Sequence, residues 1–410
     1  MNNKEKLKEA IIKCCINGTM TVKQASIRLG YSERYIKKLK ARVKNNVSML
    51  HGNCGREPKN TLPIQLKQEI LRIRNLPEYS TVNTLHFQEL LEEYHNIKIS
   101  YYALYQLLKK NNIKSPRTHR KTKQHHRRKR RSQMGELLQV DATPHEFFEN
   151  DKDKYTLHGF IDDATGVITG LYMCKNECMQ GYFEVTRQTL KKFGIPESLY
   201  ADGSSIFFNN KKEKLTVEEE LAGIEEPTTQ YSKIMNELGI SLIHANSSQA
   251  KGRVERLWNT LHDRLITEFK INRINNIEEA NAFLKKYIPR YNKKFAETAE
   301  NLISTFVTLP KYIDLETLLT VKYTRQVDNG ACFSYKNTIF KIENIDIIPR
   351  VTVELLISKR IGMKVRYKDK LYSITPILKA NNIAINNTES TDNIINEFIF
   401  FNCLKDERIA

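Results

Sequence analysis

The sequence predicts a multidomain α+β protein, with helical modules first, a mixed α/β core in the middle and a small β-barrel near the C-terminus. Three observations predict this class. The chain has 410 residues, whereas single hydrophobic cores stop growing near ~250–300 residues. Its positive charge is concentrated in the first third. The spacing of apolar residues is helical at first, then alternates between helix and strand, and finally becomes strand-like.

Basic residues are distributed unevenly along the chain. Residues 1–131 contain 30 Lys and Arg against 9 Asp and Glu, whereas the remainder contains 36 against 38. Such a block indicates that the N-terminal part binds a polyanion, most often nucleic acid. A basic segment that only aids solubility is the alternative.

The composition also predicts the cellular location of the protein. No run of ~18 apolar residues is present, so we expect no membrane partner. The N-terminus lacks the apolar stretch of a secretion signal, and the seven scattered cysteines form no disulfide framework. We therefore expect a cytoplasmic protein.

Residues 1–50 predict a first DNA-binding domain. Three short helices are expected between residues 4 and 44, with Gly18 and Gly30 ending the first two and Ser32 capping the third. A short helix, a glycine turn and a basic helix are typical of a helix-turn-helix. The basic side chains that we expect to face DNA are Lys37, Lys38, Lys40, Arg42 and Lys44. The alternative is an ordinary three-helix bundle with a solvated basic face.

A second helical DNA-binding domain is predicted over residues 62–113, with three helices, the last capped by Ser100. Two such domains in tandem suit a long DNA site, because each reads only a few base pairs. Residues 114–133 follow as a basic linker, with ten Lys and Arg and no acid between 114 and 131. We expect this run to contact phosphates without sequence preference. Its basic residues include Arg127, Arg128, Lys129, Arg130 and Arg131.

The rest of the chain predicts an α/β domain and a β-rich one. Within residues 134–300, strands are expected at 137–142, 155–161, 167–173, 198–202 and 240–244, and helices at 182–193, 234–238, 254–268 and 278–293. Three strands followed by alternating helices and strands form the ribonuclease-H-like layout. Short alternating strands with turn signals predict a small β-barrel over residues 310–378. Residues 379–410 are an Asn-rich C-terminal tail whose role the pattern does not indicate.

Three acids of the α/β domain occupy positions that suit catalysis. Asp141 lies on the first strand, Asp202 ends the fourth strand, and Glu255 opens the long helix. The ends of these two strands are adjacent in this layout and the helix crosses beside them, so the carboxylates can hold two divalent cations. Two such ions activate a water or a 3′-hydroxyl and stabilise the leaving oxygen in phosphodiester chemistry. We therefore predict a catalytic site with two Mg²⁺ or Mn²⁺ ions.

Basic side chains near these acids are candidates for DNA contacts. Lys251 and Arg253 flank Glu255 and are predicted to clamp DNA, whereas Arg256 fits a solvated helix face better. His145 either contacts the scissile phosphate or is an ordinary surface or core histidine.

Some neighbouring residues fit structural roles better than chemical ones. Asp162 and Asp163 fit a hairpin turn. Cys174 and Cys178 fit two semi-buried thiols, because no second pair completes a metal site. Trp258, the only tryptophan, fits the core.

The sequence resembles the DDE transposases and retroviral-type integrases, and most closely the ISNCY-type bacterial insertion-sequence transposases. The resemblance extends over residues 1–375, and its most specific motifs are ELLQVDATPHEFFE (136–149), FIDDATG (160–166) and QAKGRVERLWNTLHDRL (249–265). It implies that Asp141, Asp202 and Glu255 are the metal-binding triad.

The chain departs from that family in three respects. The second Asp and the Glu are separated by 52 residues, more than is common, and the charged stretch 209–229 accounts for the excess. The segment GSSIF after Asp202 replaces the family's usual basic or His-containing version, which leaves the substrate contacts there open. The N-terminal His₂Cys₂ zinc module of retroviral integrases is absent.

The resemblance implies a DNA transposase that binds the terminal inverted repeats of an insertion sequence, cleaves the 3′ ends and joins them to target DNA by metal-dependent transesterification. Its partners would be double-stranded DNA and further copies of the chain, at least a dimer on paired ends, in a bacterial cytoplasm with the nucleoid. A nuclease with the ribonuclease H fold and a catalytically inactive DNA-binding regulator are the alternatives. Tandem DNA-binding domains argue against the nuclease, and an intact acid triad argues against the regulator.

Overall fold

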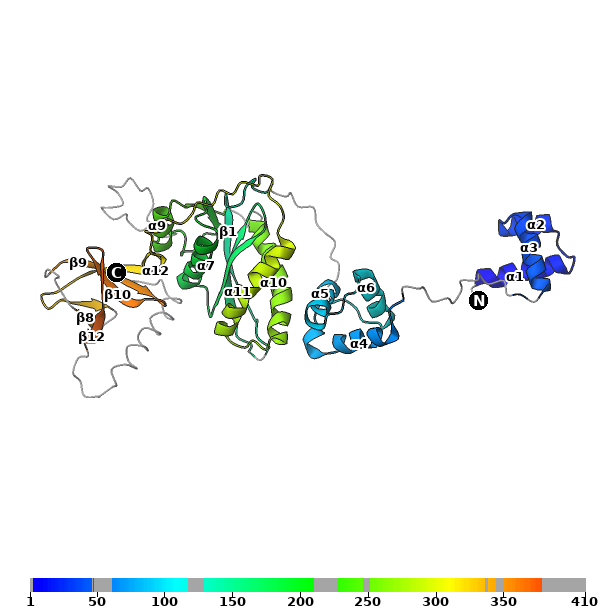
Figure 1. Ribbon diagram of the computed structural model, residues 1–410, viewed down its shortest axis with the longest axis horizontal. Coiled ribbons are helices and arrows are strands. Elements are labelled where there is room, and N and C mark those ends of the chain that lie inside the picture. The colour runs from blue at the N-terminus through cyan, green and yellow to red at the C-terminus, as the bar shows by residue number, and fades with distance from the viewer. Residues whose placement is uncertain are drawn as a thin grey trace. The chain divides into compact units, whose positions relative to one another are not determined.

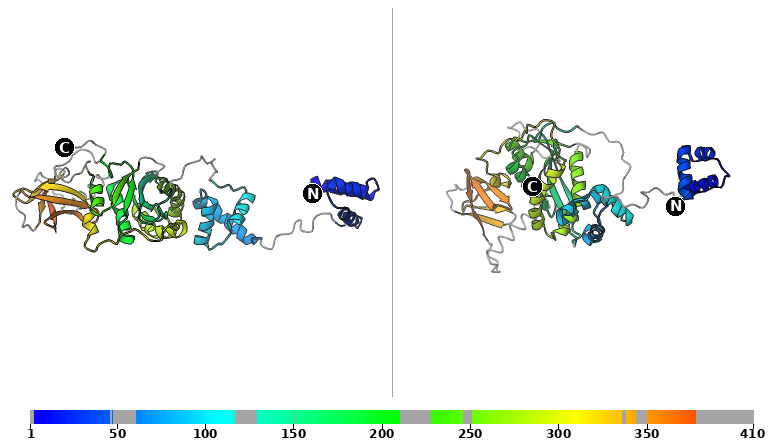
Figure 2. Two further views of the ribbon diagram at one scale, coloured as in Figure 1. Left: turned by 90° about the horizontal axis from the view of Figure 1, so that it is seen from above. Right: turned by 45° about the vertical axis from the view of Figure 1, so that its right-hand side comes forward.

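The computed structural model describes residues 3–45, 47, 61–116, 129–149, 151–209, 228–245, 251–335, 338–343 and 350–377. Figures 1 and 2 show its helices and strands. The chain divides into two compact units, residues 1–73 and 74–410. This boundary lies at the end of helix α4 (Ile64–Arg74), whereas the sequence predicted separate domains at 1–50 and 62–113.

The first unit contains the three predicted N-terminal helices, α1 (Asn3–Ile16), α2 (Val22–Leu29) and α3 (Glu33–Lys44). Both predicted signals at the turn between α2 and α3 are confirmed. Gly30 has a left-handed φ of 67°, and the Ser32 hydroxyl accepts a hydrogen bond from the Tyr35 N–H at 3.4 Å. The capping box that Thr21 forms with Gln24 at the start of α2 was not predicted. The three helices share a small core of Ile11, Ile12, Cys15, Ala25, Ile36 and Leu39.

The second unit begins with a 3₁₀ helix η1 (Pro77–Tyr79) and helices α5 (Thr84–His95) and α6 (Tyr101–Lys110). The predicted Ser100 cap of α6 is confirmed, because its hydroxyl accepts from the Ala103 N–H at 3.3 Å. Asn83 caps α5 in the same way, with the His86 N–H 3.0 Å from its side-chain oxygen. The apolar sides of the two helices are buried through Phe87, Leu90, Leu91, Leu104, Leu107 and Leu108.

A five-stranded sheet forms the centre of the second unit. It contains β1 (Leu138–His145), β2 (Tyr155–Asp162), β3 (Ile168–Cys174), β4 (Ser198–Ala201) and β5 (Ser241–His244), in the order β3-β2-β1-β4-β5. The first three strands are antiparallel neighbours, whereas β4 runs parallel to β1 and β5 runs parallel to β4. All five strands lie where the sequence predicted them, within a few residues.

Helices cover both faces of this sheet. On one face, α10 (Gly252–Ile271) and α11 (Ile277–Phe295) share a core with β2 and β3 that includes Leu157, Leu171 and Trp258. On the other face, α7 (Met179–Lys192) and α9 (Gln230–Glu237) share a core with β1 and β4 that includes Val140 and Leu199. The sheet is therefore buried on both sides, and its strand ends are the part that remains accessible for a site.

Amide side chains cover the outer edge of β3. Gln188 bonds both backbone groups of Leu171, and Asn281 and Asn292 do the same for Met173 and Ile168, at 2.8–3.2 Å. An edge strand otherwise presents unpaired N–H and C=O groups that attract another chain. Helices α7 and α11 thus close this edge with their side chains.

The predicted small β-barrel is corrected to two separate sheets. After a short helix α12 (Leu315–Leu318), the strands β6 (Val321–Gln326), β9 (Thr352–Ser358), β10 (Gly362–Tyr367) and β11 (Lys370–Tyr372) form one sheet in the order β11-β10-β9-β6. The other sheet is formed by β7 (Cys332–Tyr335), β8 (Thr338–Ile342) and β12 (Ile374–Ile377), in the order β12-β8-β7. Both sheets contribute to one core, which includes Phe333, Phe340, Leu355 and Val365. Alternating burial alone does not distinguish two facing sheets from a closed barrel.

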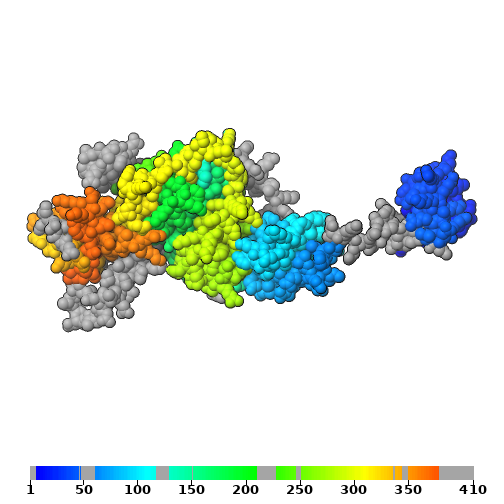
Figure 3. Space-filling model, in the orientation of Figure 1, coloured from blue at the N-terminus to red at the C-terminus, as the bar shows by residue number. Residues whose placement is uncertain are grey.

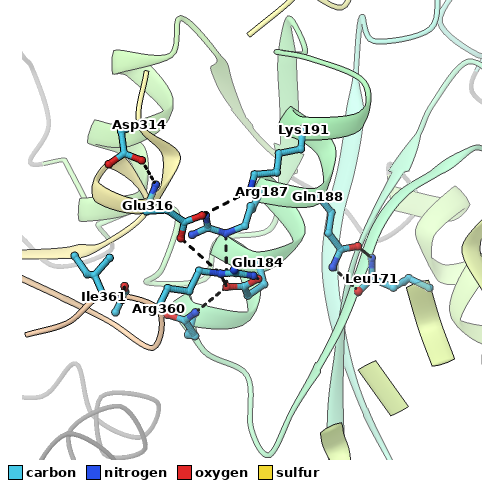
Figure 4. Close-up of polar contacts among 11 residues, drawn as sticks. Leu171, Glu184, Arg187, Gln188, Lys191, Asp314, Glu316, Arg360 and Ile361 are labelled. Carbon is cyan, nitrogen blue, oxygen red and sulfur yellow. Dashed lines mark hydrogen bonds and ion pairs between the residues drawn. The ribbon is translucent and has the colours of Figure 1, made fainter. Parts of the chain in front are cut away.

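A charged cluster joins these strands to the central sheet domain. Arg360, in the turn between β9 and β10, binds Glu184 of α7 through two hydrogen bonds of 2.8 Å (Figure 4). Arg187 of α7 binds Glu316 of α12, and its guanidinium lies 3.7 Å from Glu184. Glu184 and Arg187 are both buried, so each buried charge has an opposite charge beside it.

Candidate active site

The central sheet places Asp141 beside Asp202. Strands β1 and β4 are parallel, with Leu138 paired to Leu199 and Gln139 paired to Tyr200. Continuing that register by two residues along both strands sets Asp141 opposite Asp202, just beyond the end of β4. The two predicted acids therefore meet because of the register of one parallel strand pair.

The Lys251 ammonium bridges the two carboxylates. Its Nζ lies 2.9 Å from Asp141 Oδ1 and 3.3 Å from Asp202 Oδ2. The Lys251 and Asp141 side chains are 10% and 18% exposed, whereas that of Asp202 is 45% exposed. Burial by itself would lower the pKa of Lys251, but the hydrogen bond and charge of Asp141 and the charge of Asp202 raise it above its usual value. Lys251, predicted to clamp DNA, thus lies inside the acidic site.

Trp258 fixes the other oxygen of Asp141. Its indole N–H donates to Asp141 Oδ2 at 2.9 Å. The ring packs against Gly159, which pairs with Asp141 across β1 and β2, and a Cβ on Gly159 would lie 2.6 Å from the ring. The prediction that Trp258 belongs to the core is correct but incomplete, because no sequence pattern indicated its bond to the acid.

Glu255 lies in the first turn of α10 and is exposed. It precedes Trp258 by three residues on α10, so it shares the helix face that carries Trp258, whose indole contacts Asp141. Within the described parts of the chain, however, no three His, Cys, Asp or Glu side chains are gathered closely enough to hold a metal ion. The structure thus brings together Asp141 and Asp202, but does not gather Glu255 with them.

A buried network positions the start of α10. The Gln139 side chain accepts from the Val254 N–H at 3.1 Å and donates to Asp163 Oδ1 at 2.7 Å. Arg253 pairs with the same Asp163 oxygen at 2.9 Å, and the two side chains are 10% and 0% exposed. Arg253, predicted to clamp DNA, thus forms a buried ion pair that supplies a counter-charge to the carboxylate of Asp163.

The turn residues and cysteines have the predicted structural roles. Asp162 accepts from the backbone of Gly135 at 2.9 Å and of Thr165 at 2.8 Å, and burial raises the pKa of its carboxyl. The side chain of Cys174 is half-buried and that of Cys178 is buried.

A fourth acid, Glu177, lies near the pair. It precedes α7 and accepts a hydrogen bond from the Tyr182 hydroxyl at 2.8 Å. Partial burial of its carboxyl raises the pKa of Glu177, and the negative charges of Asp202 and Asp141 raise it further. Glu177 was not predicted, because no strand or helix signal links residue 177 to the two strand ends.

His145 lies on the same face of β1 as Asp141 but four residues further along, about 13 Å away at strand spacing. Its ring is in edge contact with that of His262 on α10, at 4.2 Å between centroids. Burial lowers the pKa of His145 and brings that of His262 to about 4. This placement favours the interpretation of an ordinary packed histidine over contact with a phosphate at Asp141.

The basic residues of α3 differ in their surroundings. Lys37, Lys38 and Lys44 are exposed, and Arg42 is half-buried. Lys40 instead donates to the backbone oxygen of Cys15 on α1, at 2.6 Å. Lys40 therefore links α3 to α1 within the helical bundle.

The end of the basic linker contacts the sheet domain. Lys129 lies 3.2 Å from Glu300, Arg130 pairs with Glu297, and Arg131 lies 3.1 Å from Glu136. Arg130 also donates to the backbone oxygen of Ala164 at 3.0 Å. Arg127 and Arg128 lie outside the described residues, as do the tail 379–410 and most of the stretch 209–229.

Helix α5 is bound to α10 and α11 by a second set of charges. Glu89 of α5 lies 2.5 Å from both Arg264 of α10 and Lys294 of α11. Tyr94 donates to Glu268 of α10 at 2.7 Å. Figure 3 shows the surface that these segments form, with residues 84–110 in light blue to cyan and α10 and α11 in yellow-green. Helix α5 thus contacts the sheet domain directly, a contact that the sequence pattern did not indicate.

The chain is similar in sequence to known proteins, although no family model matches it. It is 33% identical over 370 residues to a transposase for insertion sequence IS1202 from Streptococcus pneumoniae, covering 82% of this chain and 77% of that one. It is also 33% identical over 300 residues to the putative transposase y4bF of Sinorhizobium fredii, covering 73% and 64%.

Two solved structures align with parts of the chain. One is an HTLV-2 integrase catalytic core domain in complex with magnesium, with a TM-score of 0.29 and 16% identity, covering 40% of this chain and 88% of that one. The other is a simian T-cell lymphotropic virus intasome, with a TM-score of 0.32 and 13% identity, covering 75% of this chain and 96% of that one.

Among the helices that the structure describes, none has the length and apolar character to cross a membrane.

Proposed function

The chain belongs to the insertion-sequence transposases, and on this premise we propose that it cleaves the 3′ ends of its element and joins them to target DNA by metal-dependent transesterification. The observation that carries this mechanism is the pair Asp141, on β1, and Asp202, just beyond the end of the parallel strand β4, with a cation between them. No covalent enzyme intermediate is required, because one phosphodiester is exchanged for another.

The strand order supports a ribonuclease-H-like catalytic domain. An antiparallel β1–β2–β3 meander continues into the parallel strands β4 and β5, with helices on both faces. The helix-turn-helix at α2 and α3 is the proposed reader of the terminal inverted repeats. The domain limits that the sequence predicts remain proposals.

The acidic pair fits Mg²⁺ or Mn²⁺. Carboxylate oxygens are the ligands that these ions prefer. The Lys251 ammonium marks a point where a cation is held by both Asp141 and Asp202. When bound, two such ions would activate the attacking oxygen and stabilise the leaving one. Glu255 is the proposed third ligand, since it lies on the same face of α10 as Trp258, which contacts Asp141.

Other residues of the chain position the ligands. Trp258 holds Asp141 Oδ2, and Gln139 ties the first turn of α10, which carries Glu255, to β1. Exposed basic residues of α3 and the linker would neutralise DNA phosphates. We propose that at least two copies of the chain assemble on the paired element ends. They would act in the bacterial cytoplasm, with the nucleoid.

A strand-transfer assay with labelled element ends, Mg²⁺ and a plasmid target tests this function. We expect joined products from the wild-type chain. We expect Asp141→Asn, Asp202→Asn and Glu255→Gln each to abolish both cleavage and joining, with end binding retained. Cleavage without joining would favour a nuclease. Binding without either step in the wild type would favour a DNA-binding regulator. Near-normal joining by one variant would remove that residue from the triad.

A further inference from the structure

We propose that Lys251 is an internal cation that holds Asp141 and Asp202 together before metal binds, and that a divalent ion must displace it. The inference rests on the proposed metal-dependent chemistry at these two acids. It concerns what occupies the site in the absence of metal and how strongly metal then binds.

The hydrogen bonds divide the four carboxylate oxygens into two kinds. Asp141 Oδ2 accepts from the Trp258 indole at 2.9 Å, and Asp202 Oδ1 accepts from the Ser204 N–H at 3.1 Å. The other oxygen of each acid, Asp141 Oδ1 and Asp202 Oδ2, is bonded to the Lys251 ammonium. The protein therefore orients each acid through one oxygen, while the remaining two meet at a single point.

The cation at that point compensates the repulsion between two neighbouring carboxylates. Two negative carboxylates side by side repel each other, and a positive charge between them offsets this repulsion. Lys251 is largely enclosed by the fold around it, because its side chain is 10% exposed. In the absence of metal, the ammonium thus keeps the two carboxylates close together, in the arrangement that would bind a metal ion.

Exchange of the ammonium for a metal ion requires only a side-chain movement. Lys251 directly precedes α10 and is not part of the helix, with φ of −94° and ψ of 17°. Its charge is carried on a flexible four-carbon stem. The bonds from Trp258 and Ser204 do not involve Lys251, so both acids keep their orientation when the ammonium leaves.

This arrangement predicts that Lys251 weakens metal binding. The metal must break the two contacts of the ammonium, so its apparent affinity is lower than that of the same acids without the lysine. Lys251→Met and Lys251→Gln should therefore bind Mn²⁺ and Mg²⁺ about tenfold more tightly or better, the factor that corresponds to one charge-assisted hydrogen bond. A lysine that assisted metal binding would have the opposite effect.

The full-length protein carries a built-in reporter, because its only tryptophan is bonded to Asp141. Trp258 emission can be followed during titration with Mg²⁺, and free Mn²⁺ can be counted in parallel by electron paramagnetic resonance. Lys251→Arg retains the positive charge. Lys270→Met is the matched control, since Lys270 lies on the same helix and pairs with Glu149 at 2.9 Å. Circular dichroism establishes that each variant is folded.

We expect both neutral variants at position 251 to reach half-saturation at about one tenth of the metal concentration of the wild type or less. Lys251→Arg and Lys270→Met should stay close to the wild type. Equal or weaker metal binding by both neutral variants would overturn the proposal. If neither emission nor Mn²⁺ counting detected metal in the wild type or in the neutral variants, the metal site and the proposed chemistry would fail together, which is a distinguishable result.

Discussion

The indole N–H of Trp258 and the Oδ2 atom of Asp141 are joined by a hydrogen bond of 2.9 Å. This bond connects helix α10 to strand β1 at the proposed catalytic acid. It gives the only tryptophan of the chain a role in orienting a carboxylate as well as in filling the core.

Trp258→Phe keeps an aromatic ring in the core and removes the N–H donor. We expect 3′-end cleavage to slow by about 10- to 100-fold, since hydrogen bonds to charged groups contribute about 1.5–3 kcal/mol. Binding of element ends should not change. The measurement is the cleavage rate over a Mg²⁺ series, in which the variant should also need more Mg²⁺. An unaltered rate at every concentration would show that the bond does not orient Asp141.

Gly159→Ala should strain the contact between β2 and α10. The added Cβ would lie 2.6 Å from the Trp258 ring and 2.8 Å from Leu171, closer than real contacts allow. Overpacking of this kind costs about 1–3 kcal/mol, so urea unfolding should give a lower midpoint. Gly252→Ala is the control, because nothing lies within 4 Å of a Cβ there. Equal stability of the two variants would contradict the close packing described.

Arg253→Met should destabilise the protein, because it leaves the fully buried Asp163 without its cationic partner. Removing one partner of a buried pair costs about 3–5 kcal/mol. Arg256→Met, an exposed change on the same helix, should cost less than about 0.5 kcal/mol. Thermal unfolding compares the two. If Arg253→Met were stable and instead weakened DNA binding in a salt-dependent way, the prediction of a DNA clamp would be supported.

Lys37 and Lys40 of α3 should respond differently to substitution. Replacing the exposed Lys37 and Lys38 with Ala should reduce the slope of log affinity against log salt by up to about 1.8, since each phosphate that is no longer neutralised lowers it by about 0.9. Lys40→Met should leave that slope unchanged and lower the stability of the N-terminal bundle, because Lys40 bonds the Cys15 carbonyl at 2.6 Å. Binding isotherms across a salt series, together with unfolding curves, separate the two effects. The reverse pattern would mean that α3 presents another face to DNA.

The basic linker should show a similar contrast along its length. Replacing Arg117, Arg120 and Lys121 with Ser should flatten the salt slope by up to about 2.7 on any duplex, while sequence preference is retained. Replacing Lys129, Arg130 and Arg131 should flatten it less, because each of these already pairs with an acid of the sheet domain. Both variants are measured on element ends and on random DNA. Weaker binding confined to element ends would indicate that the run reads a groove.

The strand and helix pattern was largely predictable because it depends on local spacing. The periods of apolar residues located all five strands of the central sheet, and Ser32 and Ser100 were recognisable as caps. Short strands were also expected over residues 310–378, but their pairing depends on contacts between distant segments. For that reason, two sheets were mistaken for a barrel.

The site was predictable only where the backbone alone brings residues together. Asp141 and Asp202 followed from adjacent strand ends, whereas the directions of side chains on α10 did not follow from the sequence. Lys251, Arg253 and Trp258 all lie within four residues of Glu255, and spacing cannot tell which of them bonds an acid. The ion pair of Arg253 with Asp163 could not be predicted, because the sequence does not show that Asp163 is fully buried.

The attachment of α5 to α10 and α11 through Glu89 has a geometrical consequence. It links helix α5 by ion pairs to the helix that carries Glu255. If α6 binds a DNA end, as the sequence predicts for residues 62–113, these ion pairs would help to set the distance between that DNA and Asp141. Because these contacts bypass the linker, we expect that lengthening the chain between residues 114 and 133 leaves the position of the cut unchanged.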